Sequence, residues 1–366
     1  MFESVFKNKK ILITGHTGFK GVWLTTWLLK MGAKVVGISK DIPSRPSAFE
    51  VLNLQNKITH YYEDVRNLEP ICKILKEENP DFIFHLAAQA IVSESYKNPI
   101  ETIQTNVIGT SNVLESIRRN NKPCIAIMIT SDKCYENVEW CWGYKESDRL
   151  GGKDIYSASK GAAEVIFHAY QQSFFKENKQ ILIASARAGN VIGGGDWAQD
   201  RIVADCFRAW SENKPVSIRC PQATRPWQHV LEPLSGYLQL ACKLSQQPQL
   251  NGESYNFGPR AEQNHTVERL ILDLFKIWGP SNNINPFIAL DNRPFHEAGL
   301  LKLNCDKALF DLKWMATMSY DQNVEMVGEW YAQFYKDQTD MYQFTLSQIE
   351  KYESLAELGG IVWTQN

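Results

Sequence analysis

Short apolar runs alternate with longer stretches of helical periodicity over the first half of the chain. The first run, residues 10–14, ends in a glycine-containing turn at 15–21, and apolar positions then recur with helical spacing from Val22. Comparable runs follow at residues 34–38, 82–86, 124–130 and 181–187. Buried strands that alternate with amphipathic helices are typical of a parallel sheet covered by helices on both faces. The pattern therefore predicts an α/β protein with a doubly wound parallel sheet.

The pattern changes after about residue 189, where connections rich in glycine, proline and tryptophan join short elements. We expect residues 1–189 to form the sheet domain, and residues 190–366 to form mainly a smaller C-terminal α/β domain that binds the substrate. A stretch within 231–258 is predicted to return to the first domain. Residues 341–358 have a further helical pattern. The chain is long enough for about two domains of ordinary size.

Composition and charge narrow the class of protein. Hydrophobic residues make up 44% and charged residues 22% of the chain, as in ordinary globular proteins. The net charge of -2, with both signs interspersed, argues against nucleic acid or an anionic membrane as a partner. We see no apolar run long enough for a signal peptide or a membrane span. The eight cysteines and seven histidines are scattered without metal-ligand spacing, so we expect a cytoplasmic protein with reduced thiols and no metal.

Gly15, Gly18 and Gly21 form a G-x-x-G-x-x-G turn between the first predicted strand and helix. Because these residues lack Cβ atoms, their backbone amides can approach a pyrophosphate at the N-terminus of the helix. The spacing is wider than the plain G-x-G-x-x-G fingerprint and is that of short-chain dehydrogenases. The turn therefore indicates a Rossmann-type sheet with a dinucleotide cofactor. Three other residues of the turn are predicted to contact that cofactor, namely Thr17, Phe19 and Lys20.

Charged residues after the second predicted strand bear on the choice of dinucleotide. Asp41 stands about 20 positions beyond the glycines, where a carboxylate binds the adenosine ribose hydroxyls of NAD. Lys40 and Arg45 could instead accept the extra phosphate of NADP. We predict NAD, because a carboxylate at this position opposes a phosphate. Asp64 and Val65 are predicted to touch the adenine.

Tyr156 and Lys160 are predicted to lie one helical turn apart on the same face. A lysine there stabilises the phenolate, lowers the pKa of the tyrosine and holds the nicotinamide ribose. Ser131, Asp132 and Lys133 follow an apolar run, and ligands bind at such carboxyl ends in doubly wound sheets. Ser131 could hydrogen-bond a substrate hydroxyl, with Asp132 as an acid and Lys133 as a base. An ordinary polar loop is the alternative, and co-occurrence with the glycine turn favours a catalytic site.

Six segments carry a family resemblance that covers nearly the whole chain. They are residues 14–21 (TGHTGFKG), 85–89 (HLAAQ), 129–135 (ITSDKCY), 142–144 (WGY), 187–197 (RAGNVIGGGDW) and 225–234 (RPWQHVLEPL), and the last two are the most specific. The segments resemble those of CDP-glucose 4,6-dehydratases, a branch of the extended short-chain dehydrogenases. In the related dTDP-glucose and GDP-mannose dehydratases the strand-end trio, which here is Ser131, Asp132 and Lys133, resembles Thr-Asp-Glu or a close variant. Lys133 in place of that glutamate therefore points to the CDP-glucose branch.

The resemblance implies conversion of CDP-glucose to CDP-4-keto-6-deoxyglucose, with NAD taking hydride from C4 and returning it to C6. Tyr156 would take the proton of the 4-hydroxyl, and Asp132 would protonate the hydroxyl that leaves C6. Lys133 would remove the C5 proton as a neutral amine, or stay charged and stabilise the enolate. Homo-oligomers, dimeric or tetrameric, and a role in bacterial surface-sugar synthesis are also implied. Further cofactor contacts are implied at Ala87, Ala88, Gln89, Asn106 and Thr130.

Substrate contacts are expected mainly in the second half of the chain, where guanidinium groups suit a pyrophosphate. Trp197 is a further residue that could wall the nucleotide. Ser93 departs from the family pattern, which often has an arginine near that position. None of these residues by itself predicts that the base of the bound nucleotide is cytosine. The predicted substrate contacts are Gln89, Ser131, Asn190, Arg201, Arg219, Arg225, Trp227 and His296.

Two other functions share parts of this pattern. A sugar-nucleotide 4-epimerase also uses the glycine turn, Tyr156, Lys160 and hydride transfer at C4. It needs no acid and base for C5 and C6, so Asp132 and Lys133 favour dehydration. A non-catalytic dinucleotide-binding protein could share the fold, since fold does not imply function. The complete set of catalytic residue types weighs against it.

Overall fold

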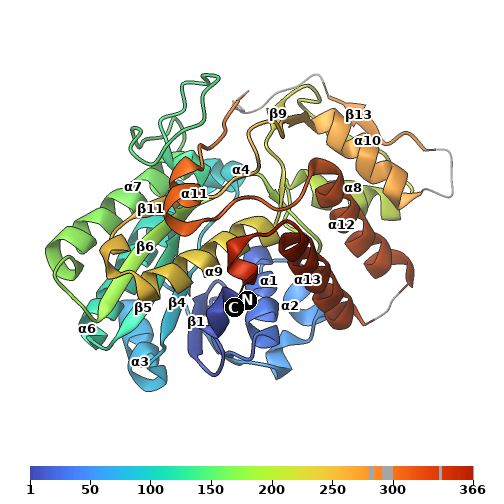
Figure 1. Cartoon of the computed structure of the whole chain (residues 1–366). Helices are drawn as coiled ribbons and strands as arrows, with labels where there is room; N and C mark the ends of the chain where they lie inside the picture. Colours follow the sequence, from blue (N-terminus) through green and yellow to red (C-terminus); the bar gives the residue numbers. More distant parts are fainter. Residues whose placement is uncertain (280–283, 291–299, 338–339, 366) are drawn as a thin grey trace.

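Seven parallel strands form the centre of the molecule (Figure 1). The computed structural model describes residues 1–279, 284–290, 300–337 and 340–365. The strand order is β11-β6-β5-β4-β1-β2-β3, and every neighbouring pair is parallel. The predicted doubly wound sheet is confirmed, and its order reverses between β1 and β4, where such folds bind ligands. The strands are β1 (Lys10–Thr14), β2 (Lys34–Ser39), β3 (Thr59–Tyr62), β4 (Phe82–His85), β5 (Cys124–Ile129), β6 (Ile181–Arg187) and β11 (Ser254–Asn256).

Alternate residues of the central strands belong to two separate hydrophobic cores. Ile11 and Ile13 of β1 lie in one core, whereas Leu12 lies in the other. Because helices cover both faces, the strands are apolar throughout, which explains the continuous runs in the sequence. The first core includes α1 (Phe19–Lys30), α9 (Leu231–Gln246) and α13 (Met341–Leu358), and the second includes α3 (Leu68–Glu78), α6 (Gly109–Asn120) and α7 (Ile155–Tyr170).

Residues beyond 230 add to the sheet region. Helix α9 packs over β5 and β6, and β11 pairs with β6 as an edge strand of the sheet. The chain runs from a second, smaller lobe into α9, continues through β11 at the edge of the sheet, and then returns to that lobe (Figure 1). The chain thus crosses between the two lobes more than once. The division of the chain at residue 189 stays a prediction.

Within the described residues, the smaller lobe contains three two-stranded sheets and the helices α8, α10 and α12, which confirms the expected α/β character of the C-terminal part. Strand β7 pairs with β10, β8 with β13, and β9 with β12. Helices α10 and α12 contact each other, and α8 contacts β8. The elements are β7 (Val191–Ile192), β8 (Val216–Ile218), β9 (Thr224–Arg225), β10 (Gln228–His229), β12 (His265–Thr266), β13 (Phe287–Ala289), α8 (Ile202–Ser211), α10 (Val267–Trp278) and α12 (Tyr320–Ala332).

The two ends of the chain lie side by side (Figure 1). The rings of Phe2 and Trp363 stack with centroids 4.9 Å apart, and Phe2 also meets Trp27 of α1 edge to face. The terminal segments therefore close one side of the first core. The remaining short helices are η1 (Phe2–Ser4), α2 (Ala48–Val51), η2 (Leu54–Asn56), α4 (Val92–Lys97), α5 (Pro99–Ile103), η3 (Gln104–Ile108), η4 (Asp132–Cys134), η5 (Gln171–Phe175), η6 (Pro248–Leu250), α11 (Asp306–Leu312), η7 (Gln333–Asp337) and η8 (Val362–Thr364).

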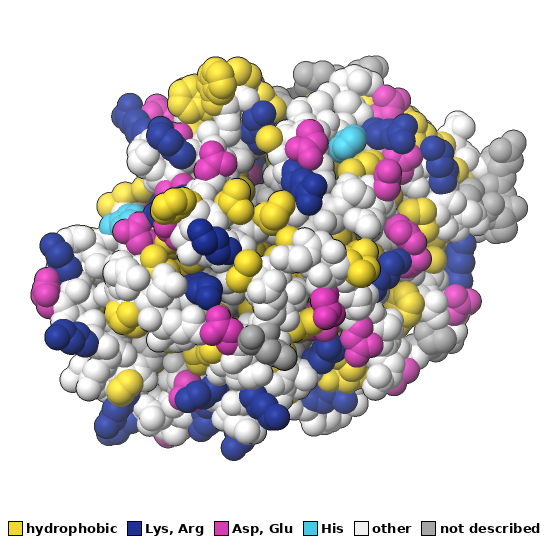
Figure 2. All heavy atoms as spheres, in the orientation of Figure 1, with side chains coloured by type: hydrophobic (Ala, Val, Ile, Leu, Met, Phe, Trp, Pro, Cys, Tyr) yellow, Lys and Arg dark blue, Asp and Glu magenta, His cyan; other side chains and the backbone are white. Residues whose placement is uncertain are grey.

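The surface mixes both signs of charge. Figure 2 shows Lys, Arg, Asp and Glu side chains interspersed over the face in view. An apolar patch at the top left lies over the loop between η4 and α7, where Val138, Trp140 and Trp142 are exposed. Within the described ranges, no helix combines the length and apolarity that crossing a membrane requires.

Candidate active site

A cleft of about 900 Å³ lies along the carboxyl ends of the parallel strands. Its lining combines the glycine turn, the ends of β2 to β5, the start of α7 and several segments of the small lobe. This is where a doubly wound sheet binds ligands. The predicted residues that line it are Gly15, Thr17, Gly18, Phe19, Lys20, Gly21, Asp41, Asp64, Val65, Ala87, Ala88, Gln89, Thr130, Ser131, Asp132, Lys133, Tyr156, Lys160, Asn190, Trp197, Arg201, Arg219, Arg225 and Trp227.

The glycine turn leaves no room for side chains at its first and last positions. Gly15 has φ +77°, and a Cβ there would lie 2.7 Å from the backbone nitrogen of Ala87. A Cβ on Gly21 would lie 2.2 Å from the carbonyl oxygen of Gly15. Thr17 ties the turn to the end of β2, because its hydroxyl donates a 2.7 Å hydrogen bond to the carbonyl of Asp41. The turn is therefore shaped for a close backbone approach to a pyrophosphate at the start of α1.

Charged side chains crowd the outer end of the cleft beside Asp41. The Lys40 ammonium lies 3.8 Å from the Asp41 carboxylate and 3.0 Å from that of Glu101 on α5. Arg66 pairs with Asp64 at 2.6 Å and lies 3.5 Å from Glu101. Lys40 and Arg66, two cations at this end, are thus each already paired with a carboxylate.

The strand-end trio occupies the floor of the cleft. The Ser131 hydroxyl donates a 2.9 Å hydrogen bond to the buried Asp132 carboxylate, and the side-chain amide of Asn190 approaches the other oxygen of Asp132 at 3.4 Å. The Ser131 oxygen also accepts a bond from the backbone N–H of Lys133, which starts the short helix η4. A Cβ on Gly189 would lie 2.0 Å from the Asp132 carboxyl group. Gly189 therefore provides the space that Asp132 occupies.

Tyr156 and Lys160 lie in the first turns of α7, as predicted, and both are buried. The helix begins there because the Asp154 carboxylate accepts a 2.9 Å bond from the backbone N–H of Ser157. Burial raises the pKa of Tyr156, opposed by Arg201 and by a hydrogen bond with the Ser131 side chain. The Tyr156 pKa is therefore raised, against the expected lowering, because burial disfavours the phenolate. Burial lowers the pKa of Lys160 to about 8.

Two further cations face the middle of the cleft. Burial lowers the pKa of Lys20 to about 7, and the neighbouring Arg201 and Lys160 add to this effect. Arg201 is fixed by a 3.2 Å hydrogen bond from its guanidinium to the carbonyl of Ala90. The cations together suit anionic diphosphate ligands.

Three predicted positions differ from the rest. Asn106 does not line the cleft, because its side chain is buried below it and bonds to the backbone of Gln89 and to the Ser159 hydroxyl. It joins the loop after β4 to α7 and is better described as a structural residue than as a cofactor contact. His296 lies outside the described residues. Ser93, where the family often has arginine, lines the cleft and donates a 2.5 Å hydrogen bond to Asp200.

Comparison with known proteins places this site in a family. The sequence model of the GDP-mannose 4,6 dehydratase family matches residues 12–327. The chain belongs to this dehydratase family. It is 41% identical over 356 residues to a CDP-glucose 4,6-dehydratase from Salmonella typhimurium, covering 96% of this chain and 98% of that one. The resemblance expected from the six sequence segments is thereby confirmed.

Solved structures share the fold of this dehydratase-family chain. A UDP-glucuronic acid 4-epimerase from Bacillus cereus, in complex with UDP-glucuronic acid and NAD, is 25% identical with a TM-score of 0.75, covering 89% of this chain and 99% of that one. A dTDP-glucose 4,6-dehydratase from Streptomyces venezuelae, with NAD bound, is 18% identical with a TM-score of 0.75, covering 90% and 100%. Dehydratases and epimerases thus share the architecture, so the fold alone does not separate them.

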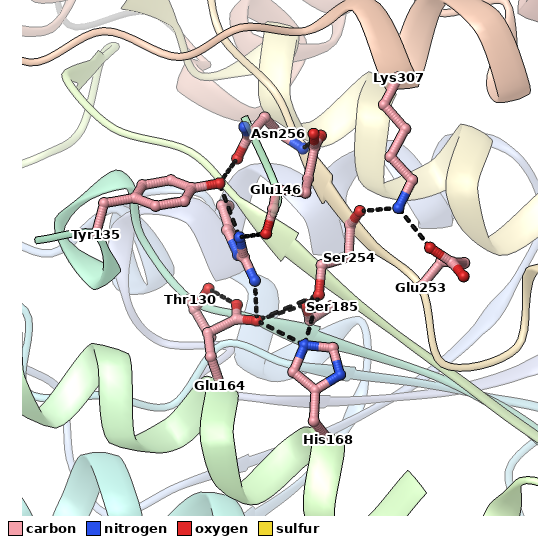
Figure 3. A network of polar contacts seen from close by, with 11 residues as sticks. Thr130, Tyr135, Glu146, Glu164, His168, Ser185, Glu253, Ser254, Asn256 and Lys307 are labelled. Atoms are coloured by element: carbon pink, nitrogen blue, oxygen red, sulfur yellow. Dashed lines mark hydrogen bonds and ion pairs between the residues drawn. The ribbon is translucent and has the colours of Figure 1, made fainter. Parts of the chain in front are cut away.

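A buried polar network fixes helix α7 to the sheet (Figure 3). Glu164, one turn after Lys160, is completely buried and accepts a 2.7 Å bond from the Arg187 guanidinium of β6. Glu164 also accepts hydrogen bonds from the hydroxyls of Thr130 and Ser185. Burial raises the pKa of Glu164, but Arg187 and these bonds outweigh it, so the net pKa is lowered. The network keeps a charged carboxylate between α7 and the end of β5.

Sequence reasoning did not assign roles to Gly189, Glu164 and Arg187. Two features of the sequence could have pointed to these roles. Gly189 and Arg187 belong to the specific segment 187–197, and Glu164 stands four residues after Lys160 on the same helical face. Their roles depend on contacts with Asp132 and Thr130, which are distant in sequence, and only the fold reveals these contacts.

Proposed function

We propose that the chain is a CDP-glucose 4,6-dehydratase that forms CDP-4-keto-6-deoxyglucose. The observation that carries this proposal is the placement of Asp132 and Lys133 beside Tyr156 in one cleft, since elimination of water needs groups that act at C5 and C6. The 41% identity to a CDP-glucose 4,6-dehydratase supports the choice of nucleotide. We further propose that residues 1–189 mainly hold the cofactor and residues 190–366 mainly hold the nucleotide sugar.

NAD is the cofactor that this cleft suits. The glycine turn would meet the pyrophosphate, because added Cβ atoms at Gly15 and Gly21 would fill the cradle. Asp41 would bind the adenosine ribose, and Lys160 the nicotinamide ribose. When bound, NAD supplies an acceptor for the hydride from C4 and, once reduced, a donor of hydride to C6.

The roles of the chain's own residues follow from their positions. Tyr156 would remove the proton of the 4-hydroxyl, assisted by its hydrogen bond with Ser131. The 4-ketone acidifies the C5 proton, so the C6 hydroxyl can leave once it is protonated. Asp132 is the acid placed for that step, because Ser131 and Asn190 hold its carboxyl group in a buried position.

Lys133 is the candidate for the C5 proton. Its side chain lines the cleft and is only partly buried. As a neutral amine it would remove the proton, and as an ammonium it would stabilise the enolate. Replacing Lys133 with methionine and following solvent deuterium exchange at C5 tests both roles, and unchanged exchange would remove Lys133 from the mechanism.

A product analysis tests the proposed reaction. The purified protein with NAD is incubated with CDP-glucose, and separately with dTDP-, UDP- and GDP-sugars, and products are identified by NMR. Substrate deuterated at C4 should give product with deuterium at C6 and with loss of the 6-hydroxyl. Asp132→Asn should abolish elimination, whereas the exposed Asp321→Asn should not. A product that keeps its 6-hydroxyl but is inverted at C4 would establish an epimerase instead.

We also propose that the chain is a homo-oligomer built on α5 and α7, which contact each other. Ile155 and Val165 of α7 are exposed, as are Ala158 and Ala169 between and beyond them, so one face of this helix is an apolar stripe. Three isoleucines beside it are exposed as well, namely Ile100, Ile103 and Ile108. An apolar surface of this extent favours a second copy of the chain as its partner.

We place the chain in the cytoplasm. The eight cysteines are all free thiols, and several of them, including Cys134 and Cys206, are buried without a partner cysteine. Burial raises the pKa of both of these thiols well above its usual range, which makes them unreactive. Reduced thiols of this kind are typical of a reducing compartment.

A further inference from the structure

Five charged side chains meet at the outer end of the cleft, where β2, β3 and α5 come together. They are Lys40, Asp41, Asp64, Arg66 and Glu101. Asp41 is the carboxylate expected at the adenosine ribose hydroxyls. The Lys40 ammonium lies 3.8 Å from this carboxylate, so it would be near a phosphate on the 2′-hydroxyl of a ribose that Asp41 binds.

Glu101 is the carboxylate that both cations share. One of its oxygens, Oε1, lies 3.0 Å from the Lys40 ammonium and 3.5 Å from the Arg66 guanidinium. Asp64 binds Arg66 through two guanidinium nitrogens and through the backbone N–H of Arg66. Arg66 thus has its own carboxylate two residues before it in sequence, whereas the carboxylate nearest in space to Lys40 comes from α5, 61 residues away in sequence.

We propose that Glu101 is a specificity-determining residue, which keeps the cleft selective for NAD over NADP by holding Lys40 and Arg66 in ion pairs. This inference rests on the proposed use of NAD. A 2′-phosphate carries about two negative charges at neutral pH, and it would have to break the Lys40–Glu101 contact while lying close to Asp41 and Glu101. A neutral side chain at position 101 would release Lys40 toward that phosphate, whereas Asp64 would still hold Arg66.

The simplest alternative is that any carboxylate near the mouth repels NADP through long-range charge alone. The two explanations differ in their dependence on Lys40. If Glu101 acts by holding Lys40, the effect of neutralising Glu101 needs Lys40 to be present. If Glu101 acts only by its charge, that effect persists without Lys40. A double-mutant cycle over the two positions separates them.

The experiment measures dissociation constants of NADH and NADPH by fluorescence titration, which needs no sugar substrate. The variants are Glu101→Gln, Lys40→Met, the double variant, and Glu77→Gln as a control, since Glu77 is an exposed carboxylate on α3 that pairs with Lys73. At low salt, Glu101→Gln should tighten NADPH binding about fivefold and change NADH binding by less than about twofold, in the range of an exposed ion pair. The gain should fall below about twofold at about 0.5 M salt.

The outcomes divide clearly. The proposal is supported if the double variant binds NADPH no more tightly than Lys40→Met does, and Glu77→Gln binds it no more tightly than the unaltered protein does. An unchanged ratio of the NADH and NADPH dissociation constants in Glu101→Gln overturns the proposal. The proposal is also overturned if the double variant still binds NADPH more tightly than Lys40→Met does. If the unaltered protein binds neither NADH nor NADPH, the proposed function fails and this inference fails with it. Tight NADH binding with an unchanged ratio leaves the proposed function standing and removes only the role of Glu101.

Discussion

The space beside Asp132 is controlled by one residue, Gly189. A methyl group on Gly189 would lie 2.0 Å from the Asp132 carboxyl group, so the acid would have to move. We expect Gly189→Ala to lower the rate of dehydration about 100-fold, as displacements of about 1 Å do at active sites, and to leave NADH binding unchanged. The control is Gly258→Ala, because a methyl group there meets no atom closer than 3.5 Å. Full activity of Gly189→Ala would show that Asp132 does not act from this position.

The charge of Lys160 should set the alkaline limit of activity. Burial lowers the pKa of this ammonium to about 8, so the group is charged below about pH 8 and loses its charge as the pH rises through that value. In the proposed mechanism a charged Lys160 holds the ribose and assists the Tyr156 phenolate. We therefore expect kcat/KM to fall above about pH 8. In Lys160→Arg the remaining kcat/KM should not fall above about pH 8, since a guanidinium stays protonated. A fall that is retained in this variant would have to come from another group.

At the scale of elements, helix α7 depends on the ion pair between Glu164 and Arg187, whose side chains are 0% and 1% exposed. Glu164→Gln leaves the guanidinium buried without its counter-charge. We expect the free energy of unfolding to fall by about 3 to 5 kcal/mol, the usual cost of breaking a buried pair. Urea unfolding measures this change. Adding Arg187→Met should restore part of the loss, because the double variant no longer buries a charge. A double variant no more stable than Glu164→Gln would assign the loss to Thr130 and Ser185.

Elements with a clear period were predictable, and very short ones were not. The runs 10–14 and 181–187 coincide with β1 and β6, and the helical pattern at 341–358 coincides with α13. The strands of the small lobe have two or three residues each, too few to establish a period of two. The proposed catalytic residues could be named from local spacing. The Glu164–Arg187 pair and the Glu101–Lys40 pair join residues 23 and 61 positions apart and required the fold.

At the scale of the whole molecule, the apolar stripe on α7 predicts how copies of the chain associate. Val165 is 56% exposed in the middle of this stripe, and a carboxylate there would be buried without a partner in a dimer. We expect Val165→Glu to weaken self-association at least about 100-fold and to give monomers at micromolar concentration. The matched control is Val138→Glu, because Val138 is 57% exposed but lies on the loop between η4 and α7. Sedimentation velocity on the unaltered protein and the two variants measures the change.

Because α7 also carries Tyr156 and Lys160, monomeric Val165→Glu should lose activity together with oligomerisation if pairing steadies this helix. A monomeric unaltered protein, or a Val165→Glu variant that still dimerises, would place the interface elsewhere.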